Sequence, residues 1–402
     1  MGKASKEILD LSFLGQEGED APSRKANLGW DAALIENARV MVVGAGALGN
    51  EVLKNLALIG VKNILIVDFD VVEKTNLAKS VLYRERDCTG EKHKVEIAVE
   101  RLKDLNPKLK LMAINGDATL DVGLGVFRKM DVVIGCLDNR MTRMWLNRYC
   151  FALGKPWVDG GILSLEGQVD VYAPGVNCYE CGLGPRALEL IEYRNGCVNR
   201  MKRYASAGLA NTNAIVASIV GAVQVQEALK LIADPSRSLA GHQFYFNGRS
   251  NYYDKLGKAT PRRATCRSHI PYAGIVEAPL SAEHSVAETL EWLAGHFNTR
   301  QISILLHHQV VLKAATGQSE KVKRFVKARP HVTEADLDGL REIPEEEVRF
   351  LEWTDTVDAG FPYPELRLRD IGVPPYHILQ VIAEGKKNYV ELSADERFLK
   401  FE

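Results

Sequence analysis

Residues 38–70, ARVMVVGAGALGNEVLKNLALIGVKNILIVDFD, contain a glycine-rich turn between a short apolar run and a helical pattern. The run from Val40 to Val43 leads into the turn, and a second apolar run, Ile64 to Val67, follows the helical pattern and ends at Asp68. This order is typical of a βαβ unit, in which the two strands are parallel. Because parallel strands need helices on the faces of their sheet, the segment predicts an α/β fold.

The alternation of strand and helix patterns continues downstream. Apolar runs at KLKLMAI, DVVIGC and PWVDGGI are separated by helical patterns at 94–105 and 140–153, which predicts a doubly wound, Rossmann-like domain. A long helical pattern at 213–232 has small residues on one face, so we expect it to pack closely on the sheet or on another subunit. The sequence texture changes after about residue 275. We expect three parts: an N-terminal arm at 1–36, the α/β domain at 37–275, and a smaller α+β domain at 276–402.

Charge and cysteine content narrow the classes of partner and compartment. With 51 Lys+Arg against 52 Asp+Glu the net charge is −1, so we expect neither nucleic acid nor a membrane as partner. The first twenty residues lack the apolar run of a secretion signal, and seven cysteines is an odd number. We therefore expect a cytoplasmic protein whose thiols are reduced, bind metal or act in catalysis, and not a disulfide framework.

The glycine turn has the spacing of a nucleotide-binding loop. Gly44, Gly46 and Gly49 form G-x-G-x-x-G between a predicted strand and helix, where backbone N–H groups can face a phosphate. Asp68 ends the next predicted strand, where a carboxylate can accept hydrogen bonds from ribose hydroxyls. Taken alone, this pattern is also typical of a nicotinamide or flavin dinucleotide site, so the oxidoreductase alternative stays open here.

Charged and amide side chains follow several of the predicted strands. They are Asp68, Asp70, Asn76, Lys79, Lys94, Asp138 and Asn139. Because strand ends on one side of a doubly wound sheet meet at one crevice, we expect these side chains to gather there. The set suits nucleotidyl transfer from ATP, with a carboxylate such as Asp138 holding Mg²⁺ and Lys79 and Lys94 offsetting the charge of two reacting anions. The alternative for each lysine alone is a solvated surface charge.

Six ordered segments carry a family resemblance: VVGAGALGNEVLKNLALIGV, VDFDVVEKTNL, KVEIAVERLKDLNP, CLDN, DGGILSLEGQV and CYEC. In this order and spacing, residues 38–235 resemble the adenylation domain of the ThiF/MoeB and ubiquitin-activating enzyme superfamily. The resemblance implies that a ubiquitin-like protein is adenylated on its C-terminal glycine with ATP and Mg²⁺, usually by a dimer. By matched position, Asp68 would bind the ribose, Asn76 and Lys94 the phosphates, and Asp138 the magnesium.

Three features depart from the family pattern. The family generally has arginine where this chain has Lys79, and lysine keeps the charge without the forked donor geometry. The TGEKHKV segment is one residue longer than usual, which makes Lys92 a fallback for Lys94. An N-terminal arginine that reaches the partner's ATP site in many relatives has only Arg24 as a candidate here.

Two short cysteine motifs suggest a zinc site. Cys178 and Cys181 form C-x-x-C, and Cys266 and His269 form C-x-x-H far downstream. Together they would complete a Cys₃His shell for one tetrahedral Zn²⁺. Similar family members close the site with a second C-x-x-C, so the histidine is a departure. The alternative for the first pair is that the thiols are redox-active or simply buried.

Cys197 follows a glycine and lies among the cations Arg194, Arg200, Lys202 and Arg203, which favour a thiolate. In thioester-forming relatives, the nucleophilic cysteine lies between the C-x-x-C and the long helix, as Cys197 does here. The hypothesis is that Cys197 attacks the acyl adenylate and carries the ubiquitin-like protein as a thioester. The alternative is a loop cysteine beside a solvated run of charges.

The C-terminal region has no pattern that indicates catalysis. We expect His307 and His308 to point to opposite sides of a strand, in structural roles. The segment 365–396 is interpreted as strand, turn, strand, with Pro374 and Pro375 in the turn. By analogy with relatives that recruit a conjugating enzyme through a C-terminal domain, residues 276–402 are a candidate docking region.

The main functional prediction is therefore an enzyme that activates a ubiquitin-like protein, forms a thioester on Cys197 and passes the protein to a conjugating enzyme, acting as a homodimer with ATP, Mg²⁺ and Zn²⁺. The first alternative is an adenylyltransferase of the ThiF/MoeB type that acts on a sulfur-carrier protein, for which Cys197 would be dispensable or would take part in sulfur transfer. An NAD-dependent oxidoreductase and a catalytically silent scaffold subunit are the remaining alternatives.

Overall fold

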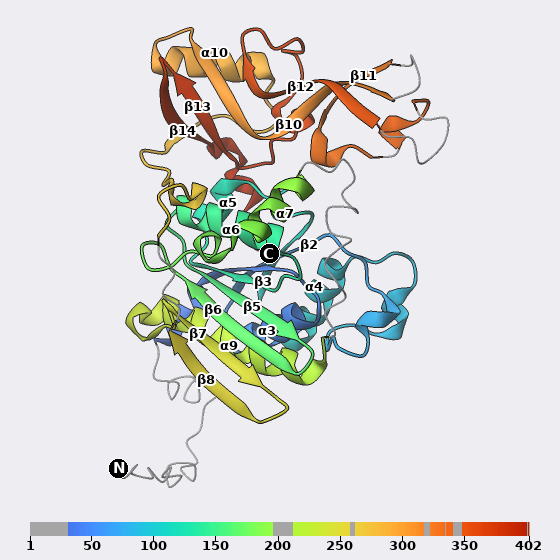
Figure 1. Cartoon of the computed structure of the whole chain (residues 1–402), viewed down its shortest axis with the longest axis vertical. Helices are drawn as coiled ribbons and strands as arrows, with labels where there is room; N and C mark the ends of the chain where they lie inside the picture. The colour runs from blue at the N-terminus through green and yellow to red at the C-terminus, as the bar shows by residue number, and fades with distance from the viewer. Residues whose placement is uncertain are drawn as a thin grey trace.

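The computed structural model describes residues 31–195, 212–257, 262–316, 322–333, 335–340, 348–399 and 401. Two sheets account for the architecture, one of eight strands and one of six. Figure 1 shows the six-stranded sheet above the eight-stranded one, with helices α5 and α6 between them.

The larger sheet has the strand order β3-β2-β1-β4-β5-β6-β7-β8. Neighbouring strands from β3 to β5 are parallel, and those from β5 to β8 are antiparallel. The chain winds from β1 toward β3 and then returns to place β4 on the other side of β1. The strands are β1 Arg39–Val43, β2 Asn63–Asp68, β3 Lys110–Asn115, β4 Val132–Gly135, β5 Trp157–Leu163, β6 Glu166–Tyr172, β7 His242–Asn247 and β8 Tyr252–Gly257.

Helices cover both faces of this sheet, which explains why its central strands are apolar between their ends. Side chains alternate along a strand, so Val40 and Val42 enter the core with α3, α4 and α9, while Met41 and Val43 enter the core with α5 and α6. The helices are α2 Ala32–Asn37, α3 Ala47–Ile59, α4 Lys94–Leu105, α5 Leu124–Arg128, α6 Arg140–Ala152, α7 Pro185–Asn195 and α9 Ala214–Ala233. The doubly wound α/β prediction is confirmed.

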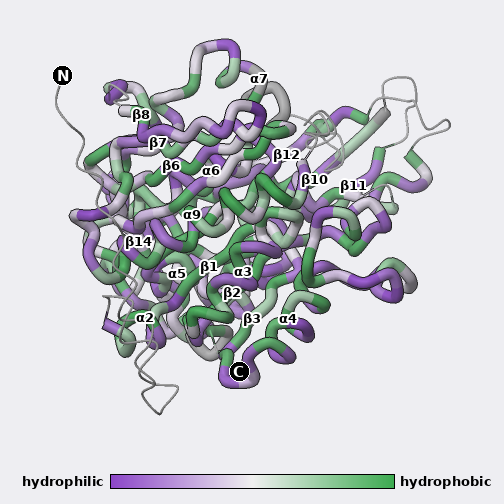
Figure 2. Tube along the Cα trace, turned by 90° about the horizontal axis from the view of Figure 1, so that it is seen from below, coloured by the Kyte–Doolittle hydropathy of each residue, from purple (hydrophilic) through white to green (hydrophobic). Residues whose placement is uncertain are grey.

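Helix α9 is long and apolar enough to cross a membrane by length and composition alone. It packs instead on α3, β5 and β6, and 56% of its most apolar window is buried in the fold. Gly221 allows this close packing, because a Cβ there would lie 2.8 Å from Glu51 Cβ on α3. Figure 2 shows the same hydrophobic character along α3, α9 and the central strands. Within the described residues, α9 is therefore a core helix of the α/β fold.

The smaller sheet has the order β11-β10-β13-β14-β9, with β12 also paired to β10. Helix α10, Val286–Phe297, packs against it and begins with a capping box between Ser285 and Glu288. The strands are β9 Val276–Ala278, β10 Ile302–Thr316, β11 Val322–Ala328, β12 Val348–Asp358, β13 Ile378–Ala383 and β14 Lys386–Leu392. The second, α+β unit is confirmed, whereas its boundary at residue 275 stays a prediction. Most of the expected arm at 1–36 lies outside the described residues, and α2 forms its end.

The two sheets meet through the segment before α5 and the segment before β13. A Cβ on Gly123 would lie 2.1 Å from the Pro375 carbonyl oxygen, so only glycine allows this approach. Leu124 N donates to His377 Nδ1 at 3.3 Å, and Arg128 forms an ion pair with the fully buried Glu391 at 2.6 Å. The contact is therefore built from close backbone packing and a buried ion pair.

Two expectations about this region were wrong. Pro374 and Pro375 precede β13, and the hairpin turn between β13 and β14 falls at Glu384 and Gly385, both with positive φ. The two histidines of β10, His307 and His308, line one small cavity between the sheets instead of pointing to opposite sides. The pairing of β10 with β12 shifts register between Leu305 and Val310, and this irregularity breaks the simple alternation of side chains.

Candidate functional site

The glycine turn after β1 packs against the loop that follows β4. Gly44 has φ +98, and a Cβ there would lie 2.3 Å from the carbonyl oxygen of Cys136. Gly49, in the first turn of α3, would bring its Cβ within 2.0 Å of the Gly44 carbonyl oxygen. Gly46 differs, because among the described residues no atom outside its own chain neighbours lies within 4 Å of its Cβ position. The first and third glycines thus allow packing, and the second leaves open space at the N-terminus of α3.

The end of β2 brings Asp68, Asp70 and Lys94 next to this turn. Asp68 accepts hydrogen bonds from Ala45 N at 2.7 Å and from Asp70 N at 2.8 Å, one on each carboxylate oxygen. Each oxygen retains a free lone pair that could accept a further hydrogen bond. Lys94 Nζ lies 2.7 Å from Asp70 Oδ2. These contacts fix the lysine and both carboxylates around the open side of the turn.

Burial and charge act in opposite directions on this group. Burial raises the pKa of the Asp68 carboxyl above its usual value. For Lys94, burial alone would lower the pKa, but the Asp68 and Asp70 carboxylates outweigh it and the pKa is raised. Lys94 is therefore a buried ammonium that keeps its proton at neutral pH. Lys92, the fallback candidate, is exposed on the preceding loop.

Asn76 and Lys79 lie on the short turn that follows β2. Asn76 Oδ1 accepts from Glu73 N at 3.0 Å, and its carbonyl oxygen accepts from Lys79 N at 3.1 Å. The Asn76 side chain thus already stabilises the turn that carries Lys79, and the Lys79 side chain is half-buried.

Two residues that the sequence prediction missed tie this turn to the glycine loop. Asn50 donates to Ala45 O at 2.8 Å and accepts from Leu82 N at 2.8 Å. Tyr83 OH donates to Ala45 O at 2.5 Å, and burial raises the pKa of this phenol. The available signal was that Asn50 is polar although it lies on the buried side of α3, where an apolar residue is expected. The loop that carries Asn76 and Lys79 is consequently held beside the glycine turn.

Asp138 lies just after β4, on the other side of β1 from Asp68. Its side chain is exposed, and Asn139 Nδ2 donates to its Oδ1 at 3.3 Å. Asn139 also caps α6 by accepting from Thr142 N at 2.8 Å. Arg143, which the sequence prediction also missed, forms an ion pair with the buried Asp159 of β5.

These groups meet where the strand order reverses, between β1 and β4. Ligands of doubly wound sheets bind at the carboxyl ends of the strands at such a point. The predicted residues Gly44, Gly46, Gly49, Asp68, Asp70, Asn76, Lys79, Lys94 and Asp138 all lie on segments at this edge. Cys197, Arg200, Lys202, Arg203 and Arg24 lie outside the described residues, and Arg194 lies near the end of α7.

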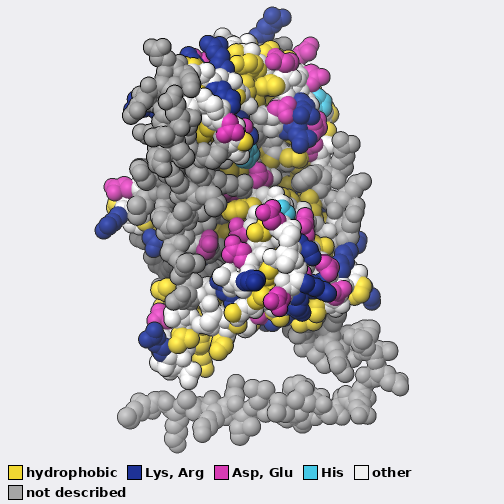
Figure 3. Space-filling model, turned by 90° about the vertical axis from the view of Figure 1, so that its right-hand side faces the viewer, with side chains coloured by type: hydrophobic (Ala, Val, Ile, Leu, Met, Phe, Trp, Pro, Cys, Tyr) yellow, Lys and Arg dark blue, Asp and Glu magenta, His cyan; other side chains and the backbone are white. Residues whose placement is uncertain are grey.

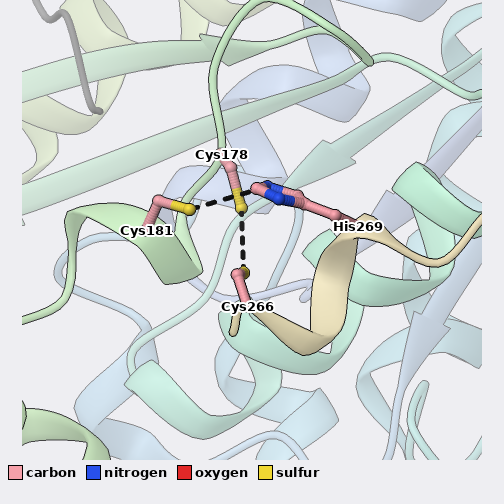
Figure 4. Close-up of side chains that lie close together, drawn as sticks. All are labelled: Cys178, Cys181, Cys266 and His269. Carbon is pink, nitrogen blue, oxygen red and sulfur yellow. Dashed lines mark hydrogen bonds between the residues drawn. The ribbon is translucent and has the colours of Figure 1, made fainter. Parts of the chain in front are cut away.

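A second cluster lies on the α6 side of the sheet, away from the glycine turn. Figure 4 shows Cys178, Cys181, Cys266 and His269 pointing toward one another from two distant segments. Their ligand atoms all lie within 4.8 Å of one another, with Cys178 Sγ 3.9 Å from Cys266 Sγ and Cys181 Sγ 3.5 Å from His269 Nε2. Two thiolates bound to a tetrahedral zinc at 2.3 Å would be about 3.8 Å apart. The arrangement therefore fits Zn²⁺.

Hydrogen-bond donors lie close to two of the sulfur atoms. Asn147 Nδ2 lies 3.3 Å from Cys178 Sγ, and Arg263 N lies 3.3 Å from Cys181 Sγ. Such donors stabilise thiolates. Arg262 Nε lies 3.0 Å from His269 Nδ1. Metal binding through Nε2 would leave a proton on Nδ1, so Arg262 would have to turn away when the metal binds.

Comparisons with known proteins cover the glycine turn and the metal cluster up to its last member, His269. The model of the ThiF family matches residues 22–268. "Adenylyltransferase and sulfurtransferase MOCS3" of Aedes aegypti is 32% identical over 234 residues, which is 58% of this chain and 50% of that protein. "Sulfur carrier protein adenylyltransferase" of Thermus thermophilus is 34% identical over 233 residues, 58% of this chain and 83% of that protein. "SUMO-activating enzyme subunit 2" of Dictyostelium discoideum is 36% identical over 149 residues, 37% of this chain and 22% of that protein. The chain spans about half the length of the MOCS3 relatives it matches.

Proposed function

Because this chain belongs to the ThiF family, we propose that it is an ATP-dependent adenylyltransferase that activates the C-terminal glycine carboxylate of a small ubiquitin-like carrier protein. The observation that carries the proposal is the protonated Lys94, held by Asp70 beside the open glycine turn at the point where the strand order reverses. This is a site for the phosphates of a nucleotide, and two relatives are named as adenylyltransferases.

The reaction brings two anions together. A carboxylate oxygen of the carrier attacks the α-phosphorus of ATP, an oxygen–phosphorus bond forms, and the bond to the pyrophosphate leaving group breaks. Lys94 and Lys79 would offset the phosphate charge, and Asp68 would accept hydrogen bonds from the ribose. Asp138 would hold Mg²⁺, which when bound supplies further positive charge at the phosphates. The exposed Asp138 carboxylate at a strand end fits such an ion.

The fate of the acyl adenylate separates two versions of the proposal. The names of the Aedes and Thermus relatives favour activation of a sulfur carrier over the thioester pathway. The Dictyostelium relative, which matches over a shorter stretch, is the support for an enzyme that activates a ubiquitin-like modifier. Thioester formation on Cys197, transfer to a conjugating enzyme, docking at residues 276–402 and a homodimer remain finer proposals.

Transfer of radioactive label from ATP tests the shared step. We expect label from α-³²P-ATP, and none from γ-³²P-ATP, on a carrier protein that ends in Gly-Gly. The matched control is the same carrier without its last glycine, which should take no label. Label from the γ position, or equal labelling of the truncated carrier, would contradict adenylation of the terminus.

A non-reducing gel separates the two fates. A thiol-sensitive adduct between the enzyme and the carrier that disappears in Cys197→Ser would support the thioester version. If Cys197→Ser forms the adenylate normally and wild-type protein forms no such adduct, the sulfur-carrier version is favoured. An adduct that survives Cys197→Ser would remove Cys197 from the proposal.

A further inference from the structure

We propose that Arg143 and Asp159 form a positioning pair that fixes the backbone before Asp138 and so sets the place of the Asp138 carboxylate in the crevice. The role of Asp138 in this inference rests on the proposed function. The contacts of Arg143 do not rest on it.

Arg143, in the first turn of α6, joins the segment that follows β4 to the middle of the neighbouring strand β5. Its Nη2 donates to the carbonyl oxygens of Leu137 at 2.6 Å and of Gly160 at 2.9 Å. Its Nε donates to Asp159 Oδ1 at 2.9 Å. Leu137 follows β4, and Asp159 and Gly160 belong to β5. One guanidinium group therefore holds the loop after β4 at a fixed distance from β5.

The pair is buried, so its geometry is closely defined. Relative side-chain exposure is 14% for Arg143 and 3% for Asp159. A buried guanidinium with a carboxylate and two carbonyl acceptors satisfies three of its donor positions in a fixed plane. The nearby charge of Asp159 raises the pKa of Arg143 against the effect of burial, so the guanidinium stays charged.

The carbonyl group that Arg143 holds is one residue before Asp138. Within the described residues, the other hydrogen bonds of this loop include Cys136 N to Val43 O at 2.8 Å, Cys136 Sγ to Gln224 Oε1 at 3.9 Å, and the Asn139 cap of α6. Among the described residues, the Asp138 side chain has only the weak hydrogen bond from its immediate neighbour Asn139, at 3.3 Å. Through Arg143, the Leu137 carbonyl is therefore the point at which the loop is held against β5. Loss of Arg143 should leave the Asp138 carboxylate present but loosely placed.

The effect should appear as weaker metal binding, not as a general loss of folding. Residues that orient a metal ligand typically change metal affinity or activity by about 10–100-fold when they are removed. We expect Arg143→Gln to raise the Mg²⁺ concentration for half-maximal adenylation by roughly tenfold. Asp159→Asn, which keeps an acceptor oxygen, should show a smaller change in the same direction. Arg143→Lys keeps the charge but not the fork, so it should restore only part of the affinity.

Two readouts do not depend on turnover. Electron paramagnetic resonance of Mn²⁺, titrated onto the full-length enzyme with a non-hydrolysable ATP analogue, should show the same loss of affinity in Arg143→Gln. Hydrogen–deuterium exchange should become faster in the peptide that covers residues 136–143, with the strands of the core unchanged.

Arg101→Gln is the matched control. Arg101 forms an equally buried ion pair with Asp87, with exposures of 8% and 1%, two helical turns along α4 from Lys94. It should lower stability without changing the Mn²⁺ affinity. If Arg143→Gln fails to fold, Asp159→Asn carries the test.

The outcomes separate the two proposals. A wild-type enzyme that adenylates no carrier contradicts the proposed function, whatever Arg143→Gln does to exchange at 136–143. An active wild type with unchanged Mg²⁺ and Mn²⁺ affinities in Arg143→Gln and Asp159→Asn overturns the positioning role.

Discussion

Gly44 and Gly46 lie two residues apart, yet a methyl group should act differently at each. At Gly44, alanine would be forced into left-handed backbone and against the Cys136 carbonyl oxygen, at 2.3 Å. We expect Gly44→Ala to lower the free energy of unfolding by at least about 1–3 kcal/mol. Gly46→Ala meets nothing within 4 Å and should cost less than about 1 kcal/mol, but should weaken ATP binding.

Urea unfolding and ATP titration of the two variants check this pair. Equal stability losses would contradict the assignment of Gly44 to packing. Unchanged ATP affinity in Gly46→Ala would mean that the nucleotide does not approach the open side of the turn.

Lys94 and Lys92 can be distinguished by the same substitution. Lys94→Met removes a buried ammonium between two carboxylates and should lower adenylation by at least roughly 100-fold, as expected for loss of a charge-stabilising donor. Lys92→Met should have a much smaller effect, because Lys92 is exposed. Adenylation rates measured at saturating ATP check this. If the longer TGEKHKV segment makes Lys92 the functional lysine, Lys92→Met would lower the rate more than Lys94→Met.

At the scale of single residues, the sequence was enough to predict those whose position is set by the end of a strand, such as Asp68 and Asp138. It missed Asn50, Tyr83 and Arg143. Their roles depend on which backbone carbonyl lies opposite them, and this is fixed only when distant strands pair. A polar residue in a helical pattern shows that a partner is needed, but not which one.

Among the elements, the two short segments of the metal cluster depend on each other. Cys178 and Cys181 follow β6, and Cys266 and His269 lie on a turn packed against α6. The ligand spacing was readable from the sequence, because C-x-x-C and C-x-x-H are local patterns. The position of the hairpin turn between β13 and β14 could not be predicted in the same way. Pro374 and Pro375 suggest a turn locally, but they lead into Tyr376, which has φ +56 and is buried in the core between the sheets.

Zinc removal should therefore loosen both segments at once. We expect about one zinc per chain, and loss of metal together with a fall in Tm of at least about 5 °C for His269→Ala. Metal analysis and calorimetry of the purified protein measure these quantities. A protein that carries no zinc when purified without chelator, and has the same Tm as His269→Ala, would contradict the metal assignment.

For the whole molecule, the doubly wound α/β class and the second, α+β unit followed from hydrophobic periodicity, but the contact between the two sheets did not. It depends on Gly123, Pro375 and buried histidines that carry no distinctive local pattern. Figure 3 shows acidic and basic side chains interspersed on the face it displays, in keeping with a net charge of −1. A partner that binds this face would therefore be recognised by local groups of side chains and not by one overall charge.

The histidines between the sheets should make the stability of the whole molecule depend on pH. Burial, together with His308 and Lys387, lowers the pKa of His307 to about 4, and the pKa values of His308 and His377 are lowered as well. The unfolded chain, with a histidine pKa of about 6.5, binds more protons between these values, so stability falls as the pH drops below about 6.5. From His307 alone we expect a loss of about 2 kcal/mol between pH 7 and pH 5.

Urea unfolding at the two pH values, with His307→Gln for comparison, measures this loss. Tyr272 OH at 3.3 Å and Gln380 Nε2 at 2.6 Å are the polar neighbours that glutamine would meet. An unchanged pH dependence in His307→Gln would show that other groups cause it.

The exchange of ³²P-pyrophosphate into ATP tests the proposed chemistry most directly, because it requires reversible formation of an acyl adenylate. With a carrier protein ending in Gly-Gly, the wild-type chain should support exchange, and Asp138→Ala should lose it while keeping its zinc and its Tm. Exchange that is absent from the wild type with every such carrier tried, or retained in full by Asp138→Ala, would contradict an adenylation site at the crevice between β1 and β4.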